Sequence, residues 1–306
     1  MSENSAFVFI KPHAHTKETI ELVKKTFAEK KISILKEGEL EAATIDEKKL
    51  IDQHYYAIAS KATIKKPAEL NVPADKFEAK FGISWQSALD DGKVFNALDG
   101  CAKLGIDADA MDKNWGIAKK ADKLIKFGGG FYCGYIEIEG KEPIYVMNGF
   151  FMSMRAKFVT PGTSIYTFVV KWDAADLKWE AFRGAVLGPT DPAQAPADSI
   201  RGMINADWEA LGLKAPPNTG DNGVHASASP FEGMAERMNW LGSALKDDPF
   251  GAALLEAGVP EAYISDGTVD PQVAIDADGK KGSLFDALED MDTADCVAKV
   301  VELSKL

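Results

Sequence analysis

The first sixty residues alternate between short apolar runs and segments with helical periodicity. Residues 6–10 (Ala-Phe-Val-Phe-Ile) form a continuous apolar run, which is typical of a buried strand. A helix is expected at 16–30 with Thr16 as its N-cap, then a strand at 32–42 and a helix at 46–60. The order strand, helix, strand, helix indicates an α/β sandwich, in which helices pack on a sheet.

The rest of the chain divides into stretches that differ in composition and in hydrophobic pattern. Residues 62–143 contain lysine–proline breaks, helical segments near 74–90, 92–104 and 115–126, and the first strand of a β-hairpin at 132–139, which pairs with 144–147. The acidic tail begins at about residue 242. Outside residues 62–143 we expect a strand at 164–171 and helices near 149–158, 174–186, 230–240, 249–257 and 284–304, with a short helix within the segment 203–218.

Charge and length exclude several classes of partner. The 306 residues carry a net charge of -12, and both nucleic acid and anionic membranes need a surplus of Lys and Arg for non-specific binding. No apolar stretch is long enough to span a bilayer, and no secretory signal begins the chain. Cys101, Cys133 and Cys296 share no short spacing, so neither a disulfide framework nor a zinc site is expected. We expect a cytoplasmic protein with no nucleic-acid or membrane partner.

The segment Asn222-Gly-Val-His225-Ala-Ser227 contains the most plausible nucleophile. His225 is one of four histidines and lies between small residues, where nothing bulky would screen it. Imidazole is a good nucleophile that is largely neutral near pH 7. Glu236, eleven residues later on an expected helix, could fix the imidazole tautomer by binding the far ring nitrogen. The alternative is a packed or solvated histidine without a chemical role.

Three other residues suit the binding of a phosphate. Lys11 directly follows a strand, Arg201 would offer a planar fork to phosphate oxygens, and Thr190 could donate its hydroxyl. Each has a simpler interpretation, as a surface lysine, a solvated arginine and a turn residue. Their occurrence together favours a phosphoryl-transfer site without a P-loop, since such a site needs a nucleophile and cations for the phosphate oxygens.

Taken together, the motifs resemble those of nucleoside diphosphate kinases. The matches fall in family order over residues 5–61 and 144–242. They comprise Phe7-Val-Phe-Ile-Lys11-Pro12, His54-Tyr55, Phe150-Phe151, Leu187-Gly-Pro-Thr190-Asp-Pro192, Ser199-Ile-Arg201-Gly202 and Asn222-Gly-Val-His225-Ala-Ser227. The Asn-x-x-His motif is fairly specific. The Lys-Pro and Ile-Arg-Gly elements, in the same order, argue against a chance match.

The resemblance implies an α+β fold, with a ferredoxin-like four-stranded antiparallel sheet covered by helices. It implies a ping-pong transfer in which His225 takes the γ-phosphate of a nucleoside triphosphate and passes it to a nucleoside diphosphate. Mg²⁺ would arrive with the nucleotide phosphates. In the roles it implies, Glu236 orients His225, Ser227 supports that carboxylate, the base stacks on Phe150, and phosphates or ribose are bound by Lys11, Tyr55, Lys61, Thr190, Arg201 and Asn222.

Four positions depart from the family pattern. The family's Asp near the magnesium is replaced by Ala228, and one phosphate-binding Arg by Lys61, which loses bidentate geometry. A second such Arg aligns with Gly184, although Arg183 is adjacent. Thr219 stands where the family has an aliphatic residue opposite the stacking Phe. Because charge-assisted contacts contribute about 1.5–3 kcal/mol each, these changes are expected to slow catalysis without abolishing it.

The expected domains are a discontinuous kinase-like core (1–61 and 144–242), an insertion (62–143) with helices and a β-hairpin, and a helical C-terminal extension (243–306). Besides an active kinase, two other hypotheses about the function stay open. One is a catalytically weak or inactive nucleotide-binding or structural relative, and the other is a different phosphotransferase. The protein partner is also open between a homo-oligomer and another protein bound through residues 62–143.

Overall fold

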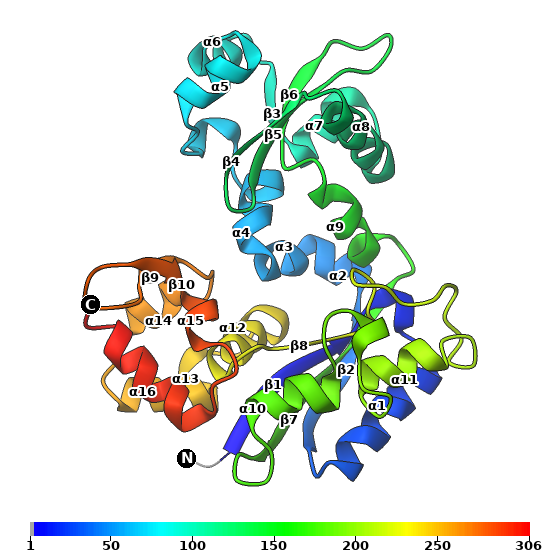
Figure 1. Ribbon diagram of the computed structural model, residues 1–306, viewed down its shortest axis with the longest axis vertical. Helices are drawn as coiled ribbons and strands as arrows, with labels where there is room; N and C mark the ends of the chain where they lie inside the picture. Colours follow the sequence, from blue (N-terminus) through cyan, green and yellow to red (C-terminus); the bar gives the residue numbers. More distant parts are fainter. Residues whose placement is uncertain (1–2) are drawn as a thin grey trace. The chain divides into compact units, whose positions relative to one another are not determined.

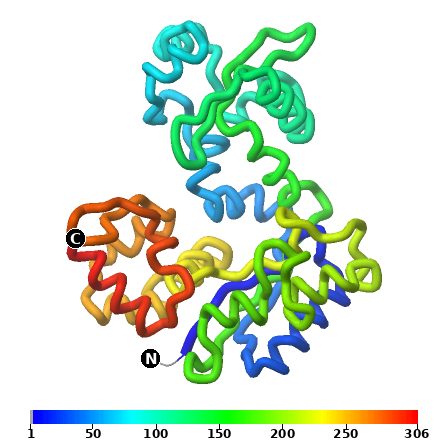
Figure 2. The backbone as a smooth tube through the Cα atoms, viewed as in Figure 1, coloured from blue at the N-terminus to red at the C-terminus, as the bar shows by residue number. Residues whose placement is uncertain are grey.

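The computed structural model describes residues 3–306, and the chain forms two compact units. One consists of Met1–Leu50 with Pro161–Leu306, and the other of Ile51–Thr160, so the chain leaves the first unit once and returns to it (Figure 2). Both units mix helices with strands, which confirms the α+β class. The resemblance predicted domain boundaries at 61/62 and 143/144. The compact units have other boundaries, because residues 51–61 and 144–160 fall in the same unit as the insertion. The domain boundaries taken from the resemblance stay a prediction.

A four-stranded sheet forms the centre of the first unit (Figure 1). Its order is β2-β7-β1-β8, and each neighbouring pair is antiparallel, as the resemblance predicted. Strand β8, only three residues long, was not expected from the local pattern. The strands are β1 (Glu3–Ile10), β2 (Ser33–Glu41), β7 (Ser164–Asp173) and β8 (Val224–Ala226).

Strand β1 is apolar from Ala6 to Ile10 because both faces of the sheet are covered there. Ala6, Val8 and Ile10 belong to the core under α1 (Lys17–Glu29) and α11 (Ile200–Ala206). The alternate residues Phe7 and Phe9 pack instead against Trp240 of α12 (Pro230–Leu241), with ring centroids 6.3 and 5.4 Å apart. Successive side chains of a strand point to opposite faces, so a run without alternation indicates burial on both sides.

The helices of the first unit confirm some expectations and correct others. Thr16 caps α1, its hydroxyl oxygen accepting the N–H of Thr19 at 3.1 Å, as predicted. The helix expected at 174–186 begins only at α10 (Trp179–Ala181) and continues as a π-helical segment, Phe182–Leu187. Shorter 3-10 turns are found at Pro12–Ala14, Pro192–Gln194 and Leu245–Asp247.

The C-terminal extension packs on α12 and belongs to the first unit. It contains helices α13 (Pro249–Glu256), α14 (Glu261–Gly267), α15 (Leu284–Leu288) and α16 (Thr293–Leu303) and a small hairpin of β9 (Gln272–Ala274) and β10 (Lys281–Ser283). A single helix over 284–304 was wrong. The chain breaks at Glu289–Asp292, where Asp290 has a left-handed φ of 62° and cannot continue a helix.

The second unit contains a sheet that the sequence pattern showed only in part. Its order is β3-β6-β5-β4, from β3 (Val94–Asn96), β4 (Leu124–Gly128), β5 (Phe131–Ile136) and β6 (Ile144–Met147). The predicted hairpin is confirmed as the antiparallel pair β5–β6. Strands β3 and β4 were missed, because β3 has three residues and β4 lies at the end of an expected helix.

Helices of the second unit are shorter than the periodicity suggested. The helix expected at 46–60 is three helices, α2 (Ala42–Glu47) in the first unit, α3 (Leu50–His54) and α4 (Tyr56–Ala59). Lys49, with a left-handed φ of 53°, separates α2 from α3, and Tyr55, with φ -102° and ψ 38°, separates α3 from α4. A π-helical turn, Ser60–Ile64, and a 3-10 turn, Pro67–Glu69, follow. The remaining helices are α5 (Ala74–Phe81), α6 (Trp85–Asp90), α7 (Ala97–Leu104), α8 (Ala108–Lys120) and α9 (Phe151–Val159).

Candidate active site

His225 lies at the centre of β8, beside β1. It is the register partner of Phe9, and the two rings stack with centroids 4.7 Å apart and planes inclined by 29°. Residues opposite each other on antiparallel strands project from the same face, which explains the contact. The His225 side chain retains 18% of its exposure, so its imidazole is supported from one side and accessible to a small ligand.

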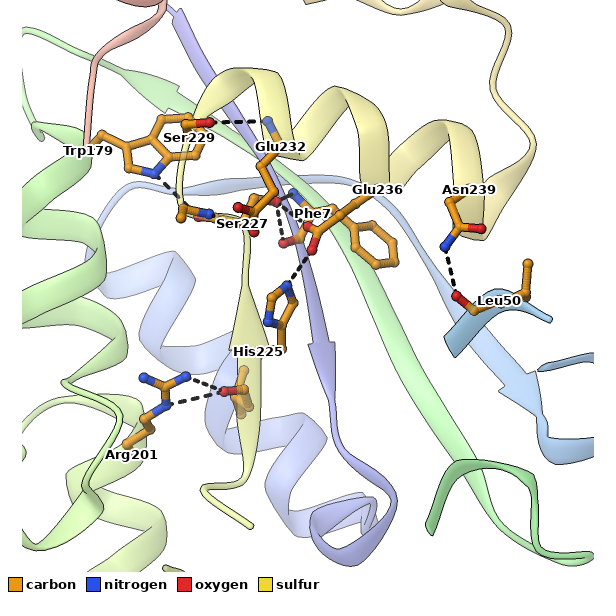
Figure 3. A network of polar contacts seen from close by, with 12 residues as sticks. Phe7, Leu50, Trp179, Arg201, His225, Ser227, Ser229, Glu232, Glu236 and Asn239 are labelled. Carbon is orange, nitrogen blue, oxygen red and sulfur yellow. Dashed lines mark hydrogen bonds and ion pairs between the residues drawn. The ribbon is translucent and has the colours of Figure 1, made fainter. Parts of the chain in front are cut away.

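A carboxylate and a hydroxyl orient the imidazole (Figure 3). His225 Nε2 lies 2.5 Å from Oε1 of Glu236 on α12, and the Ser227 hydroxyl lies 2.6 Å from Oε2 of the same carboxylate. Ser227 Oγ in turn accepts the backbone N–H of Phe7 at 2.9 Å. An ionised carboxylate only accepts hydrogen bonds, so the Nε2 proton points at Glu236 and the imidazole lone pair is on Nδ1. The expected orienting pair is therefore present in the first unit.

The surroundings keep His225 neutral. Burial lowers the pKa of this imidazole well below its ordinary value, and the nearby positive charges of Lys11, Arg201 and Arg183 lower it further. Desolvation and like charges both disfavour the protonated ring. A neutral imidazole with an oriented lone pair is the form that can attack an electrophilic phosphorus.

The loop before His225 is fixed by residues that follow β1. Lys11 donates its backbone N–H to the Gly223 carbonyl at 2.8 Å and its ammonium group to the Gly220 carbonyl at 3.1 Å. His13 Nε2 accepts the Gly223 N–H at 3.0 Å. Sequence reasoning missed His13, although it is one of four histidines and stands two residues after Lys11. These contacts place the Lys11 cation at the loop that precedes His225.

Asn222 lies in the same loop, and only the nitrogen of its side-chain amide has a hydrogen-bond partner within residues 3–306. Its Nδ2 group donates to the Thr190 carbonyl at 3.1 Å, which brings the Thr190 segment to the site. The residue is 2% exposed, and its Oδ1 atom has no hydrogen-bond donor within residues 3–306. A buried acceptor without a partner is costly, so this atom is suited to receive a donor from a ligand.

Arg201 holds the backbone of β8. Its guanidinium donates to the Val224 carbonyl from Nε (3.2 Å) and Nη2 (2.8 Å), and to the Gly188 carbonyl from Nη1 (2.7 Å). Burial lowers the pKa of Arg201 to about 10, and the charge of Arg183 adds to the effect, so the group stays cationic at neutral pH. Three of its five N–H groups serve the fold. The guanidinium predicted to bind phosphate thus already donates part of its hydrogen bonds to backbone carbonyl groups.

Arg183 is held by the C-terminal extension. Its Nη1 donates to Glu289 Oε1 at 2.6 Å and to Asp290 Oδ1 at 2.7 Å. Burial works against the charge, but the hydrogen bonds to Asp290 and Glu289 outweigh burial and raise the pKa of Arg183. Beside it, a Cβ atom on Gly184 would meet nothing within 4 Å. Arg183 therefore supplies a cation next to the position where the family's Arg is absent.

A second carboxyl group, missed in the sequence, lies one helical turn before Glu236. Glu232 Oε1 accepts the N–H of Ala228 at 3.1 Å, the position where the resemblance expected an Asp. Burial and the charge of Glu236 raise the pKa of Glu232 to about 8. At neutral pH the carboxyl group is therefore largely protonated and adds little negative charge. The only signal for it was a spacing of four residues from Glu236 on one helix.

The three remaining predicted residues belong to the second unit. The Phe150 ring packs edge-on against Tyr132 with centroids 5.8 Å apart and lies 5.9 Å from Trp115. Lys61 donates to the Ala57 carbonyl at 2.5 Å, and burial and the charge of Lys65 lower its pKa. The Tyr55 ring packs edge-on against His54. Their roles toward a ligand of His225 stay predictions.

Comparisons with known proteins give nucleoside diphosphate kinases as similar structures. The enzyme from Encephalitozoon cuniculi in its apo form is 13% identical (TM-score 0.37) and covers 78% of this chain and 89% of its own. The enzymes from Aquifex aeolicus (12%, TM-score 0.38) and Pyrobaculum aerophilum (16%, TM-score 0.36) also cover 78% of this chain, and 94% and 95% of their own. No protein-family model matches the chain, and no curated protein does. At such identities and TM-scores the chemistry of the site has to be argued from its own geometry.

Within residues 3–306, none of the helices combines the length and apolar character needed to cross a bilayer.

Proposed function

We propose that this protein is a nucleoside diphosphate kinase-like phosphotransferase with a ferredoxin-like core. It would transfer the γ-phosphate of a nucleoside triphosphate to a nucleoside diphosphate through phosphorylated His225. The observation that carries the proposal is the chain of contacts from His225 through Glu236 to Ser227, at 2.5 and 2.6 Å. A histidine held in one tautomer and kept neutral is arranged as a nucleophile rather than as a packing residue.

The geometry suits an attack by Nδ1. In the first half-reaction the Nδ1 lone pair forms a bond to the γ-phosphorus, the bond from phosphorus to the bridging oxygen breaks, and the nucleoside diphosphate leaves with that electron pair. Positive charge develops on the imidazole, and Glu236 stabilises it through Nε2–H. In the second half-reaction a terminal oxygen of another nucleoside diphosphate attacks the phosphorus and releases the imidazole.

The residues around His225 suit a polyphosphate with a polar neighbour. Lys11 and Arg201 both act on the His225 pKa, so their charges would also act on a phosphate bonded to that ring. The unpartnered Asn222 Oδ1 would accept a hydroxyl donor such as that of a ribose. The strand order β2-β7-β1-β8 agrees with the ferredoxin-like arrangement that the resemblance implies.

Mg²⁺ would be carried by the nucleotide rather than held in a protein cage. Ala228 offers no carboxylate, Glu236 is engaged by His225 and Ser227, and Glu232 is largely protonated at neutral pH. Such a donor set suits a metal that is bound mainly by phosphate oxygens and water. The ion would neutralise phosphate charge during the attack by Nδ1.

The second candidate is a nucleotide-binding relative with weak or no turnover. Two observations favour it, the use of Arg201 by backbone carbonyls and the pairing of Arg183 with Glu289 and Asp290. The first leaves fewer guanidinium N–H donors for a transferring phosphate, and the second offsets the positive charge of Arg183. In this case nucleotides bind, while His225 is not phosphorylated at a useful rate.

Incubation with γ-labelled ATP and Mg²⁺ distinguishes the two candidates. If the protein is a kinase, we expect an acid-labile, base-stable label on it that passes to added GDP. The His225→Ala variant should carry no such label. His15→Ala is the matched control, because the His15 imidazole contacts Ser164 in the same unit and is not part of the proposed site. Nucleotide binding without label on the folded wild-type protein would contradict the kinase and support the second candidate.

A further inference from the structure

The C-terminal extension places two carboxylates on a cation of the proposed site. Glu289 and Asp290, in the connection between α15 and α16, both accept from Arg183 Nη1. The backbone N–H of Asp290 also donates to the Ala228 carbonyl at 2.9 Å. The connection thus contacts both an arginine and the backbone three residues beyond His225.

This connection is anchored at its far end. Asp292 accepts hydrogen bonds from the Asn4 side chain at 2.7 Å and from the Trp179 N–H at 2.9 Å, and its other oxygen lies 3.0 Å from the Lys178 ammonium group. Thr293 donates its N–H to Asn4 Oδ1 at 2.9 Å. The two carboxylates before this anchor are therefore presented to Arg183 by a fixed backbone.

Arg183 is close enough to the nucleophile to act on it. Its charge is one of three that lower the His225 pKa, and it also acts on Arg201 and Glu232. Within residues 3–306 both side-chain hydrogen bonds of Arg183 come from Nη1, so its Nε–H and Nη2 hydrogens can donate to a ligand.

The charge balance around Arg183 opposes a phosphate. One guanidinium faces two carboxylates, so the cluster of Arg183, Glu289 and Asp290 carries a net negative charge when both carboxylates are ionised. The pairs are partly exposed, with 45% of Glu289 and 39% of Asp290 accessible, and exposed ion pairs are individually weak. A phosphate can bind a guanidinium through two parallel hydrogen bonds and so displace such pairs.

We propose that Arg183 is a phosphate-binding residue of this site, and that Glu289 and Asp290 compete with the nucleotide phosphates for it. The inference rests on the proposed function in that the phosphates belong to a nucleotide. It assigns the extension a role as a built-in competitor that lowers nucleotide affinity.

A double-mutant cycle on the full-length chain tests this. ATP binding is measured by titration calorimetry for the wild type, for Glu289→Gln with Asp290→Asn, for Arg183→Met, and for the triple variant. Removing the carboxylates should tighten binding roughly three- to tenfold, more at low than at high salt, and Arg183→Met should weaken it by a similar factor. With Arg183 absent, the carboxamide substitutions should have no effect. Asn is suited to position 290 because it tolerates the left-handed φ there.

A matched control separates this contact from the general charge of the extension. Asp295→Asn with Glu302→Gln removes the same charge from α16 and should leave ATP affinity unchanged, while thermal unfolding checks the fold of each variant. The proposal is overturned if the carboxamide variant binds ATP no more tightly than the wild type. It is also overturned if the gain persists without Arg183, or if no variant binds ATP or inorganic tripolyphosphate.

The outcomes also separate this inference from the proposed function. If His225 becomes phosphorylated but the cycle shows no coupling, only the role of Arg183 and the extension is wrong. If tripolyphosphate binding shows the coupling while His225 takes no label, the anion site stands and the transfer reaction does not.

Discussion

Ser227 donates its hydroxyl proton toward Oε2 of Glu236 at 2.6 Å, while the other oxygen of that carboxylate faces His225. Glu236 is 5% exposed, and Ser227 is fully buried. A buried carboxylate needs hydrogen-bond donors on both oxygens to stay ionised, and here each oxygen has one. The Ser227 hydroxyl therefore helps to fix the position of the Glu236 carboxylate that contacts His225.

Replacing Ser227 with Ala should slow phosphorylation of His225 about tenfold, because an oriented partner of the base is lost. It should also lower the free energy of unfolding by about 1–3 kcal/mol, since the buried N–H of Phe7 loses its acceptor. Rapid-quench labelling and urea unfolding measure the two effects. Ser229→Ala is the control, because Ser229 caps α12 and its loss should cost about 1 kcal/mol of stability without slowing the transfer.

The lowered pKa of His225 predicts a distinct pH dependence of stability. The folded imidazole protonates well below its ordinary value, so the unfolded chain takes up the proton first as the pH falls. This contribution to stability is complete above about pH 6.5 and is lost as the pH drops below that value. NMR of the imidazole should show a neutral ring at pH 6, and His225→Gln should lessen the loss of stability on acidification. A titration at the ordinary histidine pKa would contradict this environment.

The sequence predicted best where one local pattern dominated. The apolar run at 6–10 and the Thr16 cap correspond to β1 and α1, since burial on both faces and a capped amphipathic helix each have a local signature. Strand β8 has three residues and is stabilised by β1 and Arg201, so its pattern is not local. The contact of Glu236 with His225 was predictable from the motif.

The electrostatic partners of the site could not be read from the sequence. Arg183 meets Glu289 across 106 residues, and His13 meets Gly223 across 210. Such pairings depend on tertiary packing and leave no spacing to detect. For the same reason Arg201, predicted to bind phosphate, was not expected to hold the Val224 and Gly188 carbonyls.

The second unit depends on a buried ion pair between Asp52 and Arg155. Arg155 Nε lies 3.0 Å from both carboxylate oxygens of Asp52, which is fully buried and also accepts from Thr63 at 2.5 Å. Arg155→Met should destabilise the unit by about 3–5 kcal/mol because it leaves a buried charge unpaired. Lys66→Met, which removes the partner of the exposed Asp99, should cost less than about 1 kcal/mol. Amide hydrogen exchange of residues 51–160 measures both, and equal effects would show that the buried pair is not needed.

Glu232 should control how the site responds to alkaline pH. Its pKa in the folded protein, raised to about 8, lies above that of the unfolded chain. The unfolded state therefore loses this proton first, and stability falls as the pH rises from about 4.5 to 8. Glu232→Gln should remove that loss and gain about 1–2 kcal/mol in urea unfolding at pH 8.5 relative to pH 5, after allowance for partial exposure.

The same ionisation bears on the transfer. Above pH 8 a second carboxylate appears beside Glu236 and repels an incoming phosphate, so labelling of His225 should slow in the wild type as the pH rises through 8. In Glu232→Gln this slowing should be absent, whereas Glu232→Asp should retain an alkaline decline because it keeps a titratable carboxyl group. A decline of equal size in the Gln variant would assign the alkaline limb to another group and leave Glu232 only its hydrogen bond to Ala228.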